Sequence, residues 1–219
     1  LSSTASDTLL TSPIGEASLP AAPWRVVALP KQKPPVTRFD VFLLEGQRVL
    51  RVVSNQSYGN LVHPVGTGNA GAHRLSWAWR VDKAPAGNLR ERAGDDVALK
   101  VCVLFDWPLA RLPTLDRLKL ETAQAFVGEA LPTATLCYVW DAQLPTGTVL
   151  PNAYTRRLQM VVVDGQGSPL TRWTQHQRNL SADFRKAFAN EWREGDAMPP
   201  VRAVLVGGDA DNTGGEGLG

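Results

Sequence analysis

Residues 95–106 read DDVALKVCVLFD, and this stretch decides the fold class of the chain. Every odd-numbered position from 97 to 105 is apolar. A two-residue repeat places these side chains on one face of a β-strand, whereas on a helix they would spread around the axis. The even-numbered positions are also partly apolar, so we expect this strand to lie in the centre of its sheet.

The same alternation, bounded by Gly, Pro, Asn and Asp, recurs along the chain. The further expected strands are 24–27, 37–44, 47–53, 74–81, 133–140, 156–163, 170–178 and 201–206. Glu45-Gly46 is typical of a tight hairpin turn. The pattern predicts a mostly β protein, a jelly-roll-like β-sandwich of about eight to ten antiparallel strands with two short helices.

The two expected helices are residues 115–126 and 181–194. Both place apolar side chains three or four positions apart. The second begins with Ser181, a good N-cap residue. No linker or repeat divides the chain. We therefore expect an extended N-terminal segment over 1–22, a single β-sandwich domain over 23–214 and a flexible C-terminal tail over 215–219.

Composition and charge exclude several classes of protein. Hydrophobic residues make up 43% of the 219 positions and charged residues 20%, which is typical of a folded globular domain. The net charge is only +2, without a basic block, so we expect no nucleic-acid partner. No apolar stretch is long enough to span a membrane. The Ser-, Thr-, Ala- and Pro-rich residues 1–22 fit either the start of a mature exported protein or a frayed terminus.

The two cysteines, Cys102 and Cys137, each lie in an apolar stretch. They allow one disulfide, which would indicate an oxidising compartment, or two buried free thiols. Because the pairing of their strands is unknown at this point, both alternatives stay open.

Several short motifs, in their order along the chain, resemble the bacterial family DUF3047, whose function is unknown. They are Trp24-Arg25-Val26, Leu75-Ser76-Trp77-Ala78-Trp79, Leu136-Cys137-Tyr138-Val139-Trp140, Asn152-Ala153-Tyr154-Thr155, Ala182-Asp183-Phe184 and Gly208-Asp209-Ala210-Asp211-Asn212. The resemblance implies an exported or envelope-directed β-sandwich in the periplasm or outside the cell, without an established chemistry.

Five residues are candidates for ligand binding: Trp107, Tyr154, Trp173, Arg178 and Asp183. Trp107 follows the long strand and is a candidate for an exposed ring. Arg178 and Asp183 suit a salt bridge between a strand end and the next helix. Alternatively, Arg178 would bind an anionic or hydroxyl-rich ligand between Tyr154 and Trp173.

Three further groups each have a structural and a functional interpretation. Asp209, Asp211 and Asn212 begin like a calcium loop, but they also fit an Asx-rich turn. Asp95 and Asp96 form a weak glycosidase pair, because neighbouring strand residues point to opposite faces. Trp77 and Trp79 share a strand face. They could form an aromatic platform for a sugar, but the apolar residues on the same face favour a place in the core.

These features predict a non-catalytic exported domain that binds a carbohydrate or a similar polar envelope ligand. The alternative is an accessory subunit that docks on a larger envelope or membrane complex, with another envelope protein as its partner. A third hypothesis is a hydrolase that uses Asp95 or Asp183. Calcium is the one cofactor that the sequence suggests.

Overall fold

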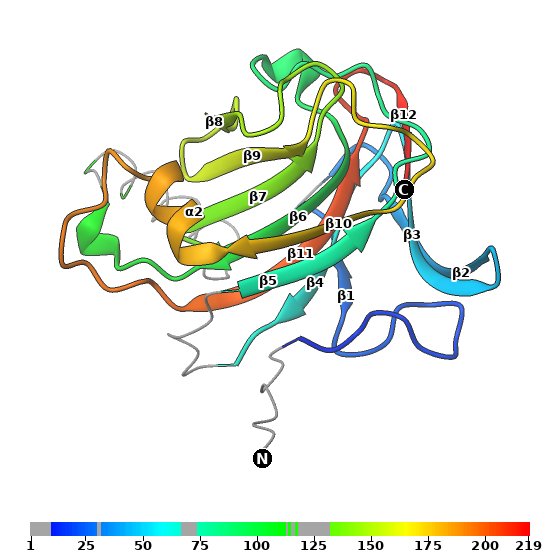
Figure 1. Cartoon of the computed structure of the whole chain (residues 1–219), viewed down its shortest axis with the longest axis horizontal. Helices are drawn as coiled ribbons and strands as arrows, with labels where there is room; N and C mark the ends of the chain where they lie inside the picture. Colours follow the sequence, from blue (N-terminus) through cyan, green and yellow to red (C-terminus); the bar gives the residue numbers. More distant parts are fainter. Residues whose placement is uncertain (1–9, 30–31, 67–73, 113, 115–116, 118–131) are drawn as a thin grey trace.

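A computed structural model describes residues 10–29, 32–66, 74–112, 114, 117 and 132–219 (Figure 1). The strands are β1 (Arg25–Val27), β2 (Arg38–Leu44), β3 (Gln47–Asn55), β4 (Tyr58–Pro64), β5 (Arg74–Trp79), β6 (Val97–Phe105), β7 (Ala134–Trp140), β8 (Val149–Pro151), β9 (Leu158–Asp164), β10 (Thr174–Asn179), β11 (Val201–Asp209) and β12 (Glu216–Leu218). The helices of the described residues are α2 (Leu180–Ala187) and two 3₁₀ turns, Arg92–Gly94 and Leu109–Arg111.

The largest layer is a seven-stranded sheet in the order β1-β4-β11-β6-β7-β9-β8. Strand β6, the stretch with the clearest alternation, is the middle strand, as its two apolar faces predict. Its neighbours β11 and β7 both run antiparallel to it. The β7–β9 pair is parallel, so the expectation of an entirely antiparallel sheet is corrected at this one pairing.

Two smaller sheets, β10-β5 and β12-β3-β2, pack against one face of the large sheet. Figure 1 shows the β10–β5 ribbon in front of the large sheet, with α2 at its end. One hydrophobic cluster joins the layers, including Val103 of β6, Val204 of β11, Val52 of β3 and Trp79 of β5. This layered arrangement around a shared core confirms the β-sandwich prediction.

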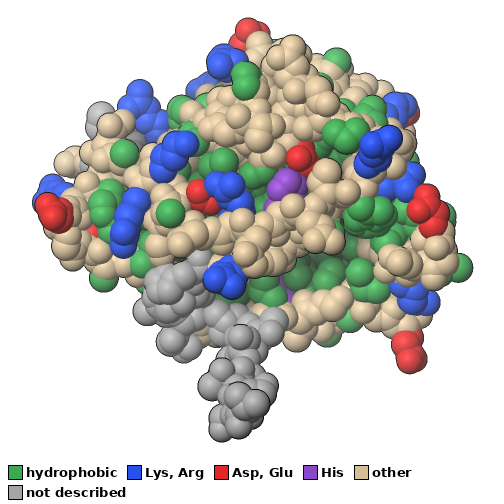
Figure 2. All heavy atoms as spheres, in the orientation of Figure 1, with side chains coloured by type: hydrophobic (Ala, Val, Ile, Leu, Met, Phe, Trp, Pro, Cys, Tyr) green, Lys and Arg blue, Asp and Glu red, His purple; other side chains and the backbone are tan. Residues whose placement is uncertain are grey.

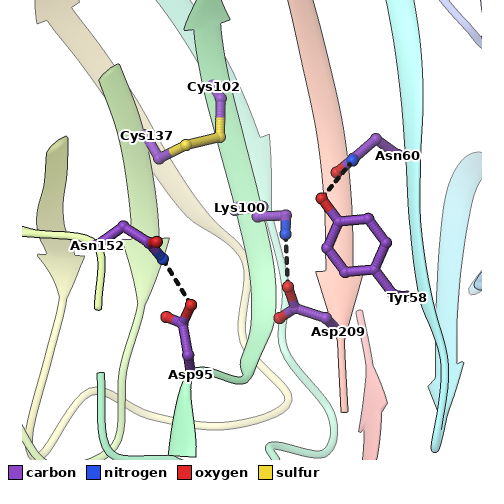
Figure 3. Close-up of a disulfide and its surroundings, with 8 residues drawn as sticks. All are labelled: Tyr58, Asn60, Asp95, Lys100, Cys102, Cys137, Asn152 and Asp209. Atoms are coloured by element: carbon purple, nitrogen blue, oxygen red, sulfur yellow. Dashed lines mark hydrogen bonds and ion pairs between the residues drawn. A yellow bond between two sulfur atoms is a disulfide. The ribbon is translucent and has the colours of Figure 1, made fainter. Parts of the chain in front are cut away.

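The opposite face of the large sheet has a second cluster, which contains both cysteines. Cys102 and Cys137 lie directly opposite each other on β6 and β7 and form a disulfide (Figure 3). The disulfide joins neighbouring strands, so the choice between a disulfide and two free thiols depends on the strand order, which the sequence does not show.

Three strands of the structure, β4, β8 and β12, are not among the strands expected from the sequence. Strand β4 contains Gly59, where a Cβ atom would lie only 3.0 Å from the Thr37 backbone nitrogen. The close backbone packing at this position therefore requires glycine, which has a poor strand propensity, and the sequence pattern does not indicate a strand here. Residues 216–218, expected in a flexible tail, instead pair with β3 as β12. This pairing satisfies backbone groups that a free tail would leave to water.

The hairpin and helix predictions have mixed outcomes. Glu45 and Gly46 both have positive φ and connect β2 to β3, which confirms the tight turn. Helix α2 is shorter than expected, and its N-cap is Asn179, whose side chain accepts from the Ala182 N–H, rather than Ser181. The expected helix 115–126 lies almost entirely outside the described residues.

Candidate binding cavity

A cavity of about 1260 Å³ lies between the large sheet and strands β3 and β5. Its floor consists of apolar side chains from the two central strands, namely Leu99 and Val101 of β6 and Val201, Val204 and Val206 of β11. Figure 2 shows hydrophobic side chains in a hollow of this face, beside the β10–β5 ribbon. A concave, mainly apolar hollow is typical of ligand-binding pockets, and this one is larger than most pockets for small molecules.

The N-terminal segment 10–14 forms part of the cavity wall. The Trp24 indole donates to the Thr11 carbonyl at 2.7 Å, and the Thr11 N–H donates to His63 Nε2 at 3.2 Å. The Trp24 and His63 rings also make an edge contact. This wall is therefore attached to β4 by specific contacts, although its sequence has no apolar period.

The charged residues that line the cavity are all basic: among the described residues, Arg48, Arg74, Arg80 and Lys100 contribute and no Asp or Glu does. Two of the four have carboxylate partners. Lys100 pairs with Asp209 at 2.6 Å, and Arg80 pairs with Asp82 and Glu45.

The other two basic side chains lack an acidic partner in the described part of the chain. Arg48 donates only to backbone carbonyls, those of Gly15, Glu16 and Ala17, so its charge is not neutralised. Arg74, at the start of β5, is exposed, and no carboxylate of the described residues lies within ion-pair distance of it. The rim of the cavity is therefore positively charged, which favours anionic groups.

A protein-family model described as "Protein of unknown function (DUF3047)" matches residues 22–219. The chain belongs to this family. A search of the curated proteins found no match. The family assignment confirms the resemblance seen in the order of the sequence motifs.

In this DUF3047 domain, Arg178 and Asp183 form the predicted salt bridge at the junction of β10 and α2. The Tyr138 hydroxyl donates to the same carboxylate at 2.9 Å. Burial, followed by the Asp183 charge, raises the pKa of Tyr138, so the phenol remains protonated. Neither side chain lines the large cavity, and the structural interpretation of the pair is the one that the geometry supports.

Trp107 is 3% exposed, and the expectation of an exposed ring is wrong. Its indole packs edge-on against Phe184 and Phe188 of the α2 region. Trp107, two residues beyond the end of β6, packs against the apolar side chains of that segment. Trp107 therefore belongs to the core rather than to a ligand site.

Tyr154 and Trp173 are exposed, at 54% and 45%, but they are in different places. Trp173 lies on the cavity rim, whereas Tyr154 donates to Asn212 Oδ1 at 3.0 Å in the C-terminal loop. The predicted five-residue group is therefore divided among the core, the rim, the β10–α2 junction and this loop.

Two of the three predicted calcium residues, Asp209 and Asn212, are engaged in protein contacts, whereas Asp211 Oδ1 is buried and has no hydrogen-bond partner among the described residues. Asp209 accepts from the Val97 N–H at 2.7 Å and from Lys100, as Figure 3 shows for Lys100. The Asn212 amide donates to Asp96 at 3.2 Å. Among the described residues, no group of three or more His, Cys, Asp or Glu side chains is arranged to hold a metal ion. The geometry favours the Asx-rich turn.

Asp95 and Asp96 have separate structural partners. Asp95 accepts from the Asn152 amide at 2.6 Å (Figure 3), and burial raises the pKa of Asp95, with a further contribution from Asp209. Asp96 is buried and accepts from the Thr213 hydroxyl at 2.6 Å. These contacts attach Asp95 to the loop of Asn152 and Asp96 to the loop of Thr213. The two carboxylates therefore do not converge on one substrate site.

Trp77 and Trp79 pack in the core, as their apolar neighbours predict. Asp164 Oδ2 accepts from the Trp79 indole at 2.5 Å and interacts with His176 Nε2 at 3.0 Å, which ties β9 to the β10–β5 ribbon. Trp77 also lines the cavity, and its indole N–H has no acceptor among the described residues.

The residues that matter most for the cavity, Arg48 and Arg74, are not apparent from the sequence. Both are single basic residues at strand ends, a position where charged residues are common on any surface. Alternation along β3 and β5 does not reveal that the two strands border one hollow. Only the strand packing reveals that.

Proposed function

We propose that this domain is a non-catalytic binding module that holds a ligand in the cavity between its sheets. The observation that carries the proposal is the coexistence of an apolar floor and an unneutralised basic rim in one open hollow. A ligand would cover apolar surface that otherwise faces water. The candidate catalytic carboxylates Asp95 and Asp183 both have structural partners, which supports binding over hydrolysis.

We also propose that the domain works outside the cytoplasm, in the bacterial periplasm or beyond. The Cys102–Cys137 disulfide supports this, because such bonds persist in oxidising compartments. Among the described residues, no helix is long and apolar enough to cross a membrane.

Native mass spectrometry of the protein purified from its own envelope tests the proposal directly. We expect a retained small molecule, which a plugging variant, Val206→Trp on the cavity floor, would lose. The matched control is Val26→Trp on the outer edge strand β1, where the side chain is exposed and no cavity is filled. Equal ligand content in the two variants would count against the cavity.

A carbohydrate is the ligand that the sequence favoured. Its structural support is Trp173, an exposed ring beside Gln175 on the rim. Aromatic faces and amide groups suit sugar rings. A glycan array with wild-type protein and Trp173→Ala would test this ligand class.

The accessory-subunit alternative is supported by exposed apolar residues on edge strand β2. Phe42 and Leu43 are both exposed there, and edge strands offer unpaired backbone groups to a partner. Co-purification of an envelope complex that Leu43→Lys abolishes would favour this function, whereas a wild-type protein that always migrates alone would exclude it.

A further inference from the structure

We propose that the cavity ligand is an amphiphile with an anionic head group, with its apolar chain over the valine-rich floor and its head at Arg48 and Arg74. This inference rests on the proposed binding function and specifies the chemistry of the ligand. It differs from the carbohydrate expectation in requiring both a long apolar body and a negative charge.

The apolar chain is argued from the floor. Leu99, Val101, Val204 and Val206 present aliphatic side chains from adjacent strands, without a polar group between them. Sugar rings need hydrogen-bond partners along their edges, and these four aliphatic side chains offer none. A hydrocarbon chain gains from such contact in proportion to its buried area.

The negative head is argued from the rim. Lys100 pairs with the buried Asp209 carboxylate at 2.6 Å, so its charge is neutralised. Arg80 is also paired. Among the described residues that line the cavity, Arg48 and Arg74 are therefore the cations without a carboxylate partner, and guanidinium groups bind carboxylate and phosphate oxygens well.

The experiment titrates the full chain with straight-chain alkanoic acids of ten, twelve and fourteen carbons and with the matching alkanols. Four tryptophans line the cavity, so intrinsic fluorescence reports occupancy: Trp24, Trp77, Trp79 and Trp173. Calorimetry gives the dissociation constants. We expect acids to bind at least tenfold more tightly than alkanols, the effect of a charge-assisted hydrogen bond. Affinity should rise up to about fourfold for each added methylene that is buried.

The variants Arg74→Gln and Arg48→Gln should each weaken acid binding severalfold and leave alkanol binding unchanged. Arg90→Gln, on an exposed loop away from the cavity, is the matched control and should change neither. Thermal melts establish that each variant is folded.

The outcomes separate this inference from the binding function itself. Alkanols that bind as tightly as acids would overturn the anionic head and leave the binding cavity intact. Binding of oligosaccharides alone, lost in Trp173→Ala, would overturn the amphiphile and still support a binding module. Failure of acids, alkanols and oligosaccharides alike, with no retained native ligand, would overturn both.

Discussion

The Arg178 guanidinium binds the Asp183 carboxylate in a two-point contact, with Nε 2.8 Å from Oδ2 and Nη2 2.6 Å from Oδ1. The pair joins the end of β10 to the first turn of α2, and Tyr138 of the large sheet donates to the same carboxylate. The Asp183 carboxylate thus connects β10, α2 and the large sheet. The contact explains how a short helix keeps a fixed position on the sandwich.

Asp183→Asn should destabilise the domain by about 2 kcal/mol, because Arg178 loses its counter-ion and the charge-assisted hydrogen bonds weaken. For a chain of this size, that corresponds to a fall in Tm of about 4–8 °C. Lys186→Ala, on the exposed side of the same helix, is the control and should change little. An Asp183→Asn protein as stable as the control would show that the bridge is dispensable.

Removing both cysteines with Cys102→Ala and Cys137→Ala should cost about 2–5 kcal/mol, the usual effect of losing a native disulfide. Because both sulfurs are buried, native protein should show no reactive thiol, and reduced, unfolded protein should show two. Denaturant unfolding and thiol titration give these values. Free thiols in protein isolated from its own compartment would contradict both the bond and the proposed location.

Lys100→Met should destabilise the fold by about 3–5 kcal/mol, because it leaves the buried Asp209 carboxylate without its counter-ion. In the wild type, burial by itself would lower the pKa of Lys100, but the charge of Asp209, its hydrogen bond and the nearby Tyr58 and Asp95 together raise that pKa, so the amine stays charged. Adding Asp209→Asn should restore much of the loss, since the amide oxygen can still accept from the Val97 N–H. If the double variant is no more stable than Lys100→Met, the two charges are not coupled.

Asp211→Asn should stabilise the domain at neutral pH. Burial raises the pKa of Asp211, and the charges of Asp209 and Asp96 raise it further. A carboxyl group whose pKa is higher in the folded state holds more protons there, so stability decreases as pH rises above the ordinary value of 3.8. The gain should therefore be present at pH 7 and shrink toward about pH 4.

Urea unfolding across this pH range measures the effect of Asp211→Asn. Glu194→Gln, on an exposed turn, serves as the charge-matched control. A gain that stays constant down to acidic pH would point to a cause other than this carboxyl group.

Trp107 and Trp173 are both candidate ligand-binding residues in the sequence, but their substitution by alanine should change the stability of the domain by different amounts. Trp107→Ala should cost about 3–5 kcal/mol, because it leaves a hole beside Phe184. Trp173→Ala should stay within about 0.5 kcal/mol of the wild type, because its ring is exposed on the cavity rim. Similar losses for both would contradict the burial assigned to Trp107.

Much of the candidate site lay beyond sequence-based prediction. The β-sandwich, the central position of β6 and the Arg178–Asp183 bridge follow from alternation and from a separation of five residues. Strand β4 was missed because close packing at Gly59 opposes its propensity, and Trp107 was misplaced because its position at a strand end does not indicate what covers it.

The sequence by itself determined which residues share a strand face, because side-chain direction alternates along a β-strand whatever its neighbours. It also determined the Glu45-Gly46 hairpin, whose geometry is local. Only the tertiary structure decided that Cys102 meets Cys137 and that Arg48 and Arg74 border one cavity. These pairs come from separate strands, and the order and stacking of strands arise from burial summed over the whole chain rather than from local spacing.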